Sequence, residues 1–132
     1  LPFHFVCRHC SEGTVVSAIG PDEMLGGYAK YQKMPPQEAV KEMAHDTMKL
    51  ALAVLQHEAI GAAQEKRVAL PYLDQAIVDF CLKTPYEWRI REGRRKWLLA
   101  EAAKLVLPAS IAERPKKAAQ YGSGIAKAMK NG

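Results

Sequence analysis

Residues 14–31 read TVVSAIGPDEMLGGYAKY, and their order indicates a strand, a tight turn and the start of a helix. Two β-branched residues, Val15 and Val16, favour a strand. Small residues then favour a turn, and Pro21 followed by the acidic Asp22 is typical of a first helical turn. In α/β proteins a turn of this kind lies at the carboxyl end of a strand, where ligands usually bind.

This arrangement suits a phosphate group and its metal ion. Backbone N–H groups at the start of a helix can bind phosphate, and Asp22 can hold the divalent cation that phosphate brings. A simpler interpretation is a capped helix that follows a buried strand. The spacing alone leaves both interpretations open.

The rest of the chain reads mainly as helices. Apolar residues at helical spacing predict a long helix from about residue 36 to 64, on a stripe that includes Met48, Leu52 and Leu55. Shorter helices are expected over 1–11, after a cap at Asp74, after residue 96 and, weakly, after residue 122. Residues 88–93 are expected to form a turn-rich connection. The helix after Asp74 is expected to bury Ile77, Val78, Phe80 and Cys81. Residues 67–73 are expected to be an extended approach to a proline. We therefore predict one domain over 1–132 that is mainly α with one short strand.

The expected strand poses a problem, because a single strand cannot satisfy its own backbone groups. The core of that strand is Val15 and Val16. Either the sheet is completed from outside this chain, or the strand is small and marginal. The paired glycines Gly26 and Gly27 pose a second problem, because each costs about 1 kcal/mol in a helix relative to alanine. We expect close backbone packing or a ligand to compensate for them.

Two groups of polar residues allow a functional and a structural interpretation. Zinc accepts the ligand types found among His4, Cys7, His9 and Cys10. No second cysteine or histidine pair follows at a suitable distance, so buried thiols on a helix face are the simpler interpretation. On the long helix, His45 and Asp46 lie beside the apolar stripe, and we expect them on a solvated face.

Charge and composition narrow the classes of partner. The 132 residues contain 19 Lys+Arg and 14 Asp+Glu, a net charge of +5 that suits an anionic partner such as nucleotide or nucleic acid. Three cysteines do not make a disulfide framework, so we expect a cytoplasmic protein. There is no apolar run of about 18 residues, so we expect no membrane-spanning segment.

The opening stretch resembles a motif of asparagine synthetases and their ATP-dependent amide-forming relatives, S-G-x-G-x-D-E-L-F-G-G-Y. The positions that match in register are Ser17, Gly20, Asp22, Glu23, Gly26, Gly27 and Tyr28. Ala18 replaces the first glycine of the motif. The resemblance continues with PYLD at 71–74, which is similar to P-F-L-D, and GRRKWLLA at 93–100, which is similar to G-x-x-K-x-x-L-R.

That resemblance implies a fold, a reaction and a site. The fold is the C-terminal portion of an α/β adenine-nucleotide α-hydrolase-like domain, also called a PP-loop ATP pyrophosphatase domain. In the family, ATP activates a small-molecule carboxylate as an acyl-adenylate, and ammonia then displaces AMP. The resemblance places Ser17, Ala18 and Gly20 beside ATP, makes Asp22 a Mg²⁺ ligand, and makes Lys96 the catalytic cation. These roles agree with chemistry that depends on positioning and charge neutralisation. If they hold, the Asp22 carboxylate and the Lys96 amine should lie within roughly 10 Å of each other on one concave surface.

This sequence also departs from the family pattern. The S-G-G-x-D-S pyrophosphate loop does not occur in these residues, and Arg67, Ala69 and Ala100 stand where the family usually has glutamate, arginine and arginine. We therefore expect a partner chain or a preceding segment that carries the loop, or a homo-oligomer. Two alternatives stay open: a relic that keeps the fold without the chemistry, and a basic helical module that binds nucleic acid. The basic surface of that module would consist of Arg89, Arg91, Arg94, Arg95, Lys96, Arg114, Lys116 and Lys117. The second lacks a groove-recognition motif, so a nucleic-acid partner is not expected.

Overall fold

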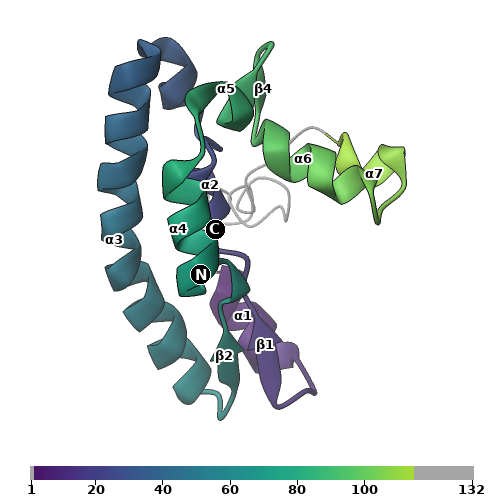
Figure 1. Cartoon of the computed structure of the whole chain (residues 1–132). Coiled ribbons are helices and arrows are strands. Elements are labelled where there is room, and N and C mark those ends of the chain that lie inside the picture. The colour runs from purple at the N-terminus through teal and green to yellow at the C-terminus, as the bar shows by residue number, and fades with distance from the viewer. Residues whose placement is uncertain (1, 115–132) are drawn as a thin grey trace, which may run out of the picture.

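The computed structural model describes residues 2–114, and this part of the chain is mostly helical (Figure 1). The helices are α1 (Pro2–His9), α2 (Pro21–Met24), α3 (Pro36–Ala62), α4 (Gln75–Lys83), α5 (Tyr86–Arg89), α6 (Trp97–Lys104) and α7 (Ala109–Ala112), and the 3-10 turns are η1 (Ala29–Lys33) and η2 (Pro71–Leu73). The strands are β1 (Thr14–Val16), β2 (Arg67–Ala69), β3 (Ile90–Arg91) and β4 (Arg94–Arg95). The helix expected after residue 122 and the basic residues Lys116 and Lys117 lie outside the described residues.

The expectation of a single strand is wrong. β1 pairs in parallel with β2, with Thr14 opposite Arg67 and Val16 opposite Ala69. The segment expected to be only an extended approach to Pro71 is therefore the missing strand partner. Because β2 satisfies one edge of β1, this pairing needs no strand from outside the chain.

A second strand pair lies in the segment that we expected to be an irregular connection. β3 and β4 are antiparallel, with Ile90 opposite Arg95. Their two-residue turn, Glu92 and Gly93, has positive φ angles of 50° and 75°. Both central residues of a type I′ turn take this conformation, because its twist matches that of the strands. We call β3, the turn and β4 the hairpin.

Helix α3 connects the two strands of the first pair, because it lies between β1 and β2 in the chain. It begins at Pro36, as predicted, and runs along one side of the molecule, with α5 near its start and β2 near its end (Figure 1). Its buried residues are Ala39, Met43, Asp46, Leu50 and Gly61. The second half of the predicted apolar stripe is wrong, because Met48, Leu52 and Leu55 are 78%, 67% and 62% exposed. Helix α1 packs on other side chains of α3, and the centroids of the Phe3 and His57 rings are 4.3 Å apart.

Two small clusters form the core. One contains Tyr31, Ala39, Met43 and Ile90, and the other contains Met24, Leu25 and Cys81. Gly26 packs closely against Ile90, which belongs to both the hairpin and the first cluster. Its φ is +72°, and a Cβ on it would lie 2.8 Å from Ile90 Cγ1. Close packing therefore accounts for this glycine.

The prediction for the helix after Asp74, which is α4, is correct in part. The Asp74 carboxylate accepts a hydrogen bond of 3.0 Å from the Ala76 N–H, which confirms the predicted cap of α4. Cys81 is buried, as predicted, but Ile77 and Phe80 are exposed. In the described part of the chain, no helix is both long and apolar enough to cross a membrane.

Candidate functional site

Strand pairing places Ser17 at the carboxyl end of the parallel strands. The Ser17 N–H donates to the Ala69 carbonyl oxygen at 2.9 Å, one step beyond the last paired residues. Ser17 is buried, whereas Ala18 is exposed. Gly20 closes the turn with a φ of +114°, and a Cβ there would lie 2.9 Å from Leu73 Cδ2. The 17–20 turn and the PYLD segment therefore pack directly against each other.

Asp22 and Lys96 meet, although they lie far apart in the sequence. The Lys96 Nζ is 3.1 Å from the Asp22 Oδ1, and the two side chains are 25% and 29% exposed. This confirms the expected proximity of the two groups. Asp22 belongs to α2, and Lys96 immediately precedes α6 with a left-handed backbone, φ 53° and ψ 40°. The distance tests their positions and not their roles.

Gly27 gives Asp22 its space. A Cβ on Gly27 would lie 2.7 Å from both the Cα and the Cγ of Asp22. Carbon atoms in contact prefer separations of roughly 3.5–4.0 Å, so any larger residue must push Asp22 away. The Gly27 N–H also donates to the Asp22 carbonyl at 2.7 Å, which holds the two backbones together. The second glycine of the pair is thus required by the position of Asp22.

The start of α2 offers less to a phosphate than we expected. The N–H groups of Glu23 and Met24 both donate to the Gly20 carbonyl, at 3.1 and 3.0 Å. They are therefore engaged within the turn itself. Helix α2 is also only four residues long. The expectation that free N–H groups at this helix start bind phosphate is wrong for these two groups.

The residues at α2 fit a magnesium ion that already carries phosphate. Glu23 accepts a hydrogen bond of 2.5 Å from the Tyr28 hydroxyl, and burial together with this carboxylate raises the pKa of Tyr28. Asp22 is reachable from solvent. Mg²⁺ typically uses one or two carboxylates and takes its other ligands from phosphate and water, so one accessible carboxylate is a suitable donor set.

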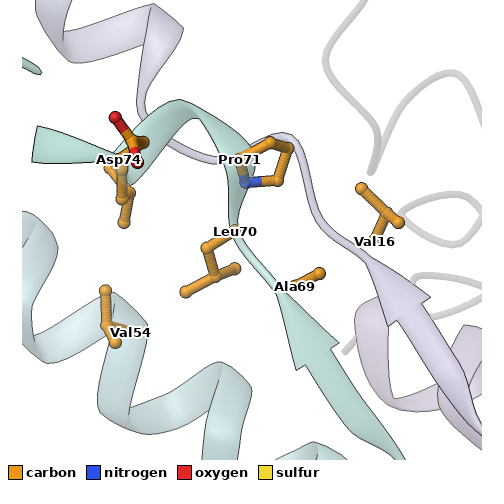
Figure 2. Close-up of a pocket in the computed structure, with 7 residues that line it drawn as sticks. Val16, Val54, Ala69, Leu70, Pro71 and Asp74 are labelled. Carbon is orange, nitrogen blue, oxygen red and sulfur yellow. The ribbon is translucent and has the colours of Figure 1, made fainter. Parts of the chain in front are cut away.

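A hollow of about 630 Å³ lies beside the start of the 17–20 turn. Figure 2 shows it between α3, the ends of β1 and β2, and the segment that leads into α4. Its lining residues are Val16, Val54, Ala69, Leu70, Pro71, Leu73 and Asp74. Val16 and Ala69 are the last residues of their strands, so the hollow opens at the carboxyl edge, where ligands of α/β proteins bind.

Arg89 was expected on a basic surface, but it is buried. It is 1% exposed, and its guanidinium donates to the carbonyls of Thr84, Leu82 and Met24 at 2.7, 3.0 and 3.1 Å. Burial lowers its pKa. Arg89 therefore ties α2 to the end of α4 and is not available to a nucleic acid. No pattern in the sequence signals a buried arginine.

Asp46 is also buried, contrary to the expected solvated position. Its carboxylate accepts a hydrogen bond of 2.8 Å from the Tyr31 hydroxyl and pairs with Lys49 at 2.8 Å and with Lys30. Burial pushes its pKa upward, but the hydrogen bonds from Lys30, Lys49 and Tyr31 outweigh burial and hold the pKa well below the usual range. This network fastens η1 to α3.

Among the described residues, one group of metal-ligand side chains lies close together, and it is not the cysteine group. It consists of Glu42, His45 and Asp46, whose ligand atoms lie within 4.8 Å of one another. Lysine ammonium groups already pair with both carboxylates. Cys7 is buried, and the Cys10 thiol donates to the Glu12 carboxylate at 3.1 Å.

Three segments that resemble family motifs meet at this site, namely residues 17–28, 71–74 and 93–100. Comparison with known proteins tests that resemblance. The model of a family described as Asparagine synthase matches residues 34–131. The chain belongs to the asparagine synthase family. It is 32% identical to "Putative asparagine synthetase [glutamine-hydrolyzing] 1" of Methanocaldococcus jannaschii over 83% of this chain and 27% of that protein.

Two other relatives extend the comparison. Asparagine synthetase B [glutamine-hydrolyzing] of Escherichia coli is 30% identical over 84% of this chain and 20% of its own length. Carboxyethyl-arginine beta-lactam-synthase of Streptomyces clavuligerus is 27% identical over 86% of this chain and 22% of its own. The chain thus spans about a fifth to a quarter of the length of these asparagine synthase family relatives.

Proposed function

We propose that this chain is part of an ATP-dependent, amide-forming ligase of the cytoplasm that activates a carboxylate by adenylation. It corresponds to the C-terminal portion of a PP-loop ATP pyrophosphatase domain. Ser17, Ala18 and Gly20 lie beside the nucleotide, and Asp22 holds Mg²⁺. The single observation that carries the proposal is the contact of 3.1 Å between Lys96 Nζ and Asp22 Oδ1, because two sequence-distant members of one motif set meet at a strand end.

In this reaction the substrate carboxylate forms a bond to the α-phosphorus of ATP, and the bond to pyrophosphate breaks. Ammonia then attacks the acyl carbon and AMP leaves. Mg²⁺ would neutralise charge on the pyrophosphate. Lys96 presents a positive charge beside Asp22. A fixed positive charge there would stabilise the negative charge that develops during adenylation. The apolar hollow beside Ser17 suits the body of a small-molecule substrate, since such pockets are mainly apolar with few polar groups.

The experiment is equilibrium dialysis of labelled ATP against the 132-residue chain, alone and mixed with the pyrophosphate-loop segment of a relative, with and without Mg²⁺. We expect Mg²⁺-dependent binding in the mixture, weakened about tenfold or more by Asp22→Asn, since metal-site partners are typically worth that much. Asp79→Asn, which changes a carboxylate bound to Gln75 on α4, is the matched control. Binding that is absent from the mixture, or unchanged by Asp22→Asn, contradicts the proposal.

Turnover in the reconstituted enzyme separates the two charged residues. Lys96→Ala should reduce kcat far more than it weakens ATP binding, because its contact strengthens as charge develops. Equal losses in both quantities would show that Lys96 contributes only to ground-state binding.

We further propose that a loop-bearing partner chain or a second copy covers the exposed apolar side chains. Met48, Leu52 and Leu55 form one exposed strip on α3, and Leu105 and Val106 are 86% and 80% exposed after α6. Large apolar patches rarely stay open on monomeric proteins. Sedimentation equilibrium should show self-association that Leu52→Glu reduces, or capture of the loop-bearing segment. A monomer that ignores that segment would contradict this proposal.

The basic-surface alternative loses much of its support. Of the residues proposed for a phosphate footprint, Arg89 is buried, Arg95 donates to the Gly27 carbonyl, and Lys96 pairs with Asp22. A salt series with random duplex DNA is the direct comparison, because nucleic-acid binding through these charges must weaken steeply with salt.

A further inference from the structure

The hairpin is attached to the 22–32 segment at three polar points. Gln32 Nε2 donates to the Gly93 carbonyl at 2.7 Å, in the hairpin turn. At the other end of the hairpin, Arg95 Nη1 donates to the Gly27 carbonyl at 2.9 Å. The third point is the Lys96 contact with Asp22. The segment that carries Asp22 and the hairpin that precedes Lys96 are therefore joined by contacts within the protein itself.

The backbone of Lys96 needs external support. Its φ of 53° is in the left-handed region, which disfavours residues that have a Cβ. Residues in such conformations persist where the surrounding structure fixes them. The residue immediately before Lys96 is Arg95, which is half-buried and bonded across to Gly27. Gly27 is in turn the residue that packs against Asp22.

We propose that Arg95 is a positioning residue that directs the Lys96 ammonium toward Asp22. Its guanidinium fixes the end of β4 on the Gly27 carbonyl, so Lys96 leaves the strand at the level of the Asp22 carboxylate. The opposing possibility is that charge attraction alone holds the pair. That attraction is modest for side chains a quarter exposed, because water screens them. The catalytic meaning of this positioning rests on the proposed function, but the geometry does not.

The test measures how fast the Lys96 amine is acylated, without ATP or metal. A trace of acetic anhydride labels the folded chain, and mass spectrometry reports Lys96 relative to Lys104, which pairs with Glu101 at 2.8 Å on α6. We expect Arg95→Ala to raise the relative rate at Lys96 by about tenfold, the fold-change that loss of one charged hydrogen bond permits. Arg95→Lys, which keeps a cationic donor, should recover most of the protection.

Arg94→Ala is the matched control, because Arg94 lies on the same strand but donates to the Ala112 carbonyl at 3.2 Å. It should leave the Lys96 rate within about twofold of the original, since its bond does not reach the Asp22 segment. Urea unfolding checks that each variant is folded, and Arg95→Gln replaces Arg95→Ala if the latter is not.

Two results would overturn the inference. One is an unchanged Lys96 rate in a folded Arg95→Ala or Arg95→Gln variant together with a raised rate in Asp22→Asn, which would show that attraction alone holds the pair. The other is an equal rise in Arg94→Ala, which would show general loosening of the hairpin. Failure of ATP binding with Arg95-dependent protection intact would reject the proposed function and leave this inference standing.

Discussion

Replacing Gly27 with alanine is the most direct perturbation of the Asp22 environment. The new Cβ would lie 2.7 Å from Asp22 Cα, a backbone atom that cannot swing aside as a side-chain tip can. Relief requires a shift of roughly 1 Å toward normal carbon contact distances. Overpacking of this kind costs about 1–3 kcal/mol. The shift also disturbs the Lys96 pair, worth up to about 1 kcal/mol.

A matched glycine isolates this effect from the general behaviour of Gly→Ala changes. Alanine reduces the conformational freedom of the unfolded chain, which by itself stabilises the fold by about 0.4–1 kcal/mol. Gly13 has nothing within 4 Å of its hypothetical Cβ and no positive φ. Gly13→Ala should therefore be neutral or slightly stabilising, while Gly27→Ala should be about 2–3 kcal/mol less stable than it.

Urea unfolding followed by circular dichroism at 222 nm measures the difference. With a slope of about 1–3 kcal/mol/M, the midpoint of Gly27→Ala should fall about 1 M or more below that of Gly13→Ala. Acylation of Lys96 should also rise in Gly27→Ala only. Equal midpoints for the two variants would refute the reasoning, because they would show that Asp22 and Gly27 are not in firm contact.

Three other predictions concern the buried charges. Asp46→Ala should cost about 2–4 kcal/mol in urea unfolding, because it leaves the buried Tyr31 hydroxyl unpaired. Glu42→Ala, which removes a more exposed partner of Lys30, should cost clearly less, because water screens that pair. Since the folded pKa of Asp46 is depressed, its stabilisation is fully present above the unfolded pKa of 3.8 and is lost as pH falls from there toward the folded pKa; Asp46→Ala should flatten a pH series of unfolding free energies in that range. Arg89→Met should lower the stability by about 3 kcal/mol, because it leaves buried carbonyls unpaired. Arg91→Met, at an exposed position, should cost about 1 kcal/mol or less. If thermal unfolding showed Arg91→Met to be the less stable variant, Arg89 would not be a structural tie between α2 and α4.

The sequence was most informative where local chemistry decides structure. The Asp74 cap, the start of α3 at a proline and the proximity of Asp22 to Lys96 were all predicted and all occur. The glycine pair was expected to weaken a helix, but α2 ends at Met24 and neither glycine lies in a helix. Close packing on Ile90 and Asp22 accounts for both glycines. The cap and the helix start each depend on one residue type in one local setting, which a pattern can reveal. The proximity of Asp22 to Lys96 is a tertiary contact, and it was expected from the family resemblance.

Features that depend on tertiary packing were missed. β2 is three residues long, too short for an alternating pattern to identify it. The hairpin had a weak signal in Glu92-Gly93, since a short polar turn that ends in glycine is typical of two-residue hairpins. Asp46 and Arg89 were placed in solvent because charged residues usually are, and their burial follows from partners contributed by other elements.

The crossover through α3 has a consequence for the order in which the site forms during folding. Arg95 and Gly27 are 68 residues apart in the sequence, and β1 and β2 can pair only after the chain has passed through the whole of α3. Forming α3 first replaces a flexible loop by a rod of roughly 40 Å, at 1.5 Å per residue, and this lowers the entropy lost on closure. Contacts between distant residues form slowly, so the Asp22–Lys96 pair is expected to assemble after the scaffold. Amide exchange during refolding should accordingly protect α3 before the hairpin.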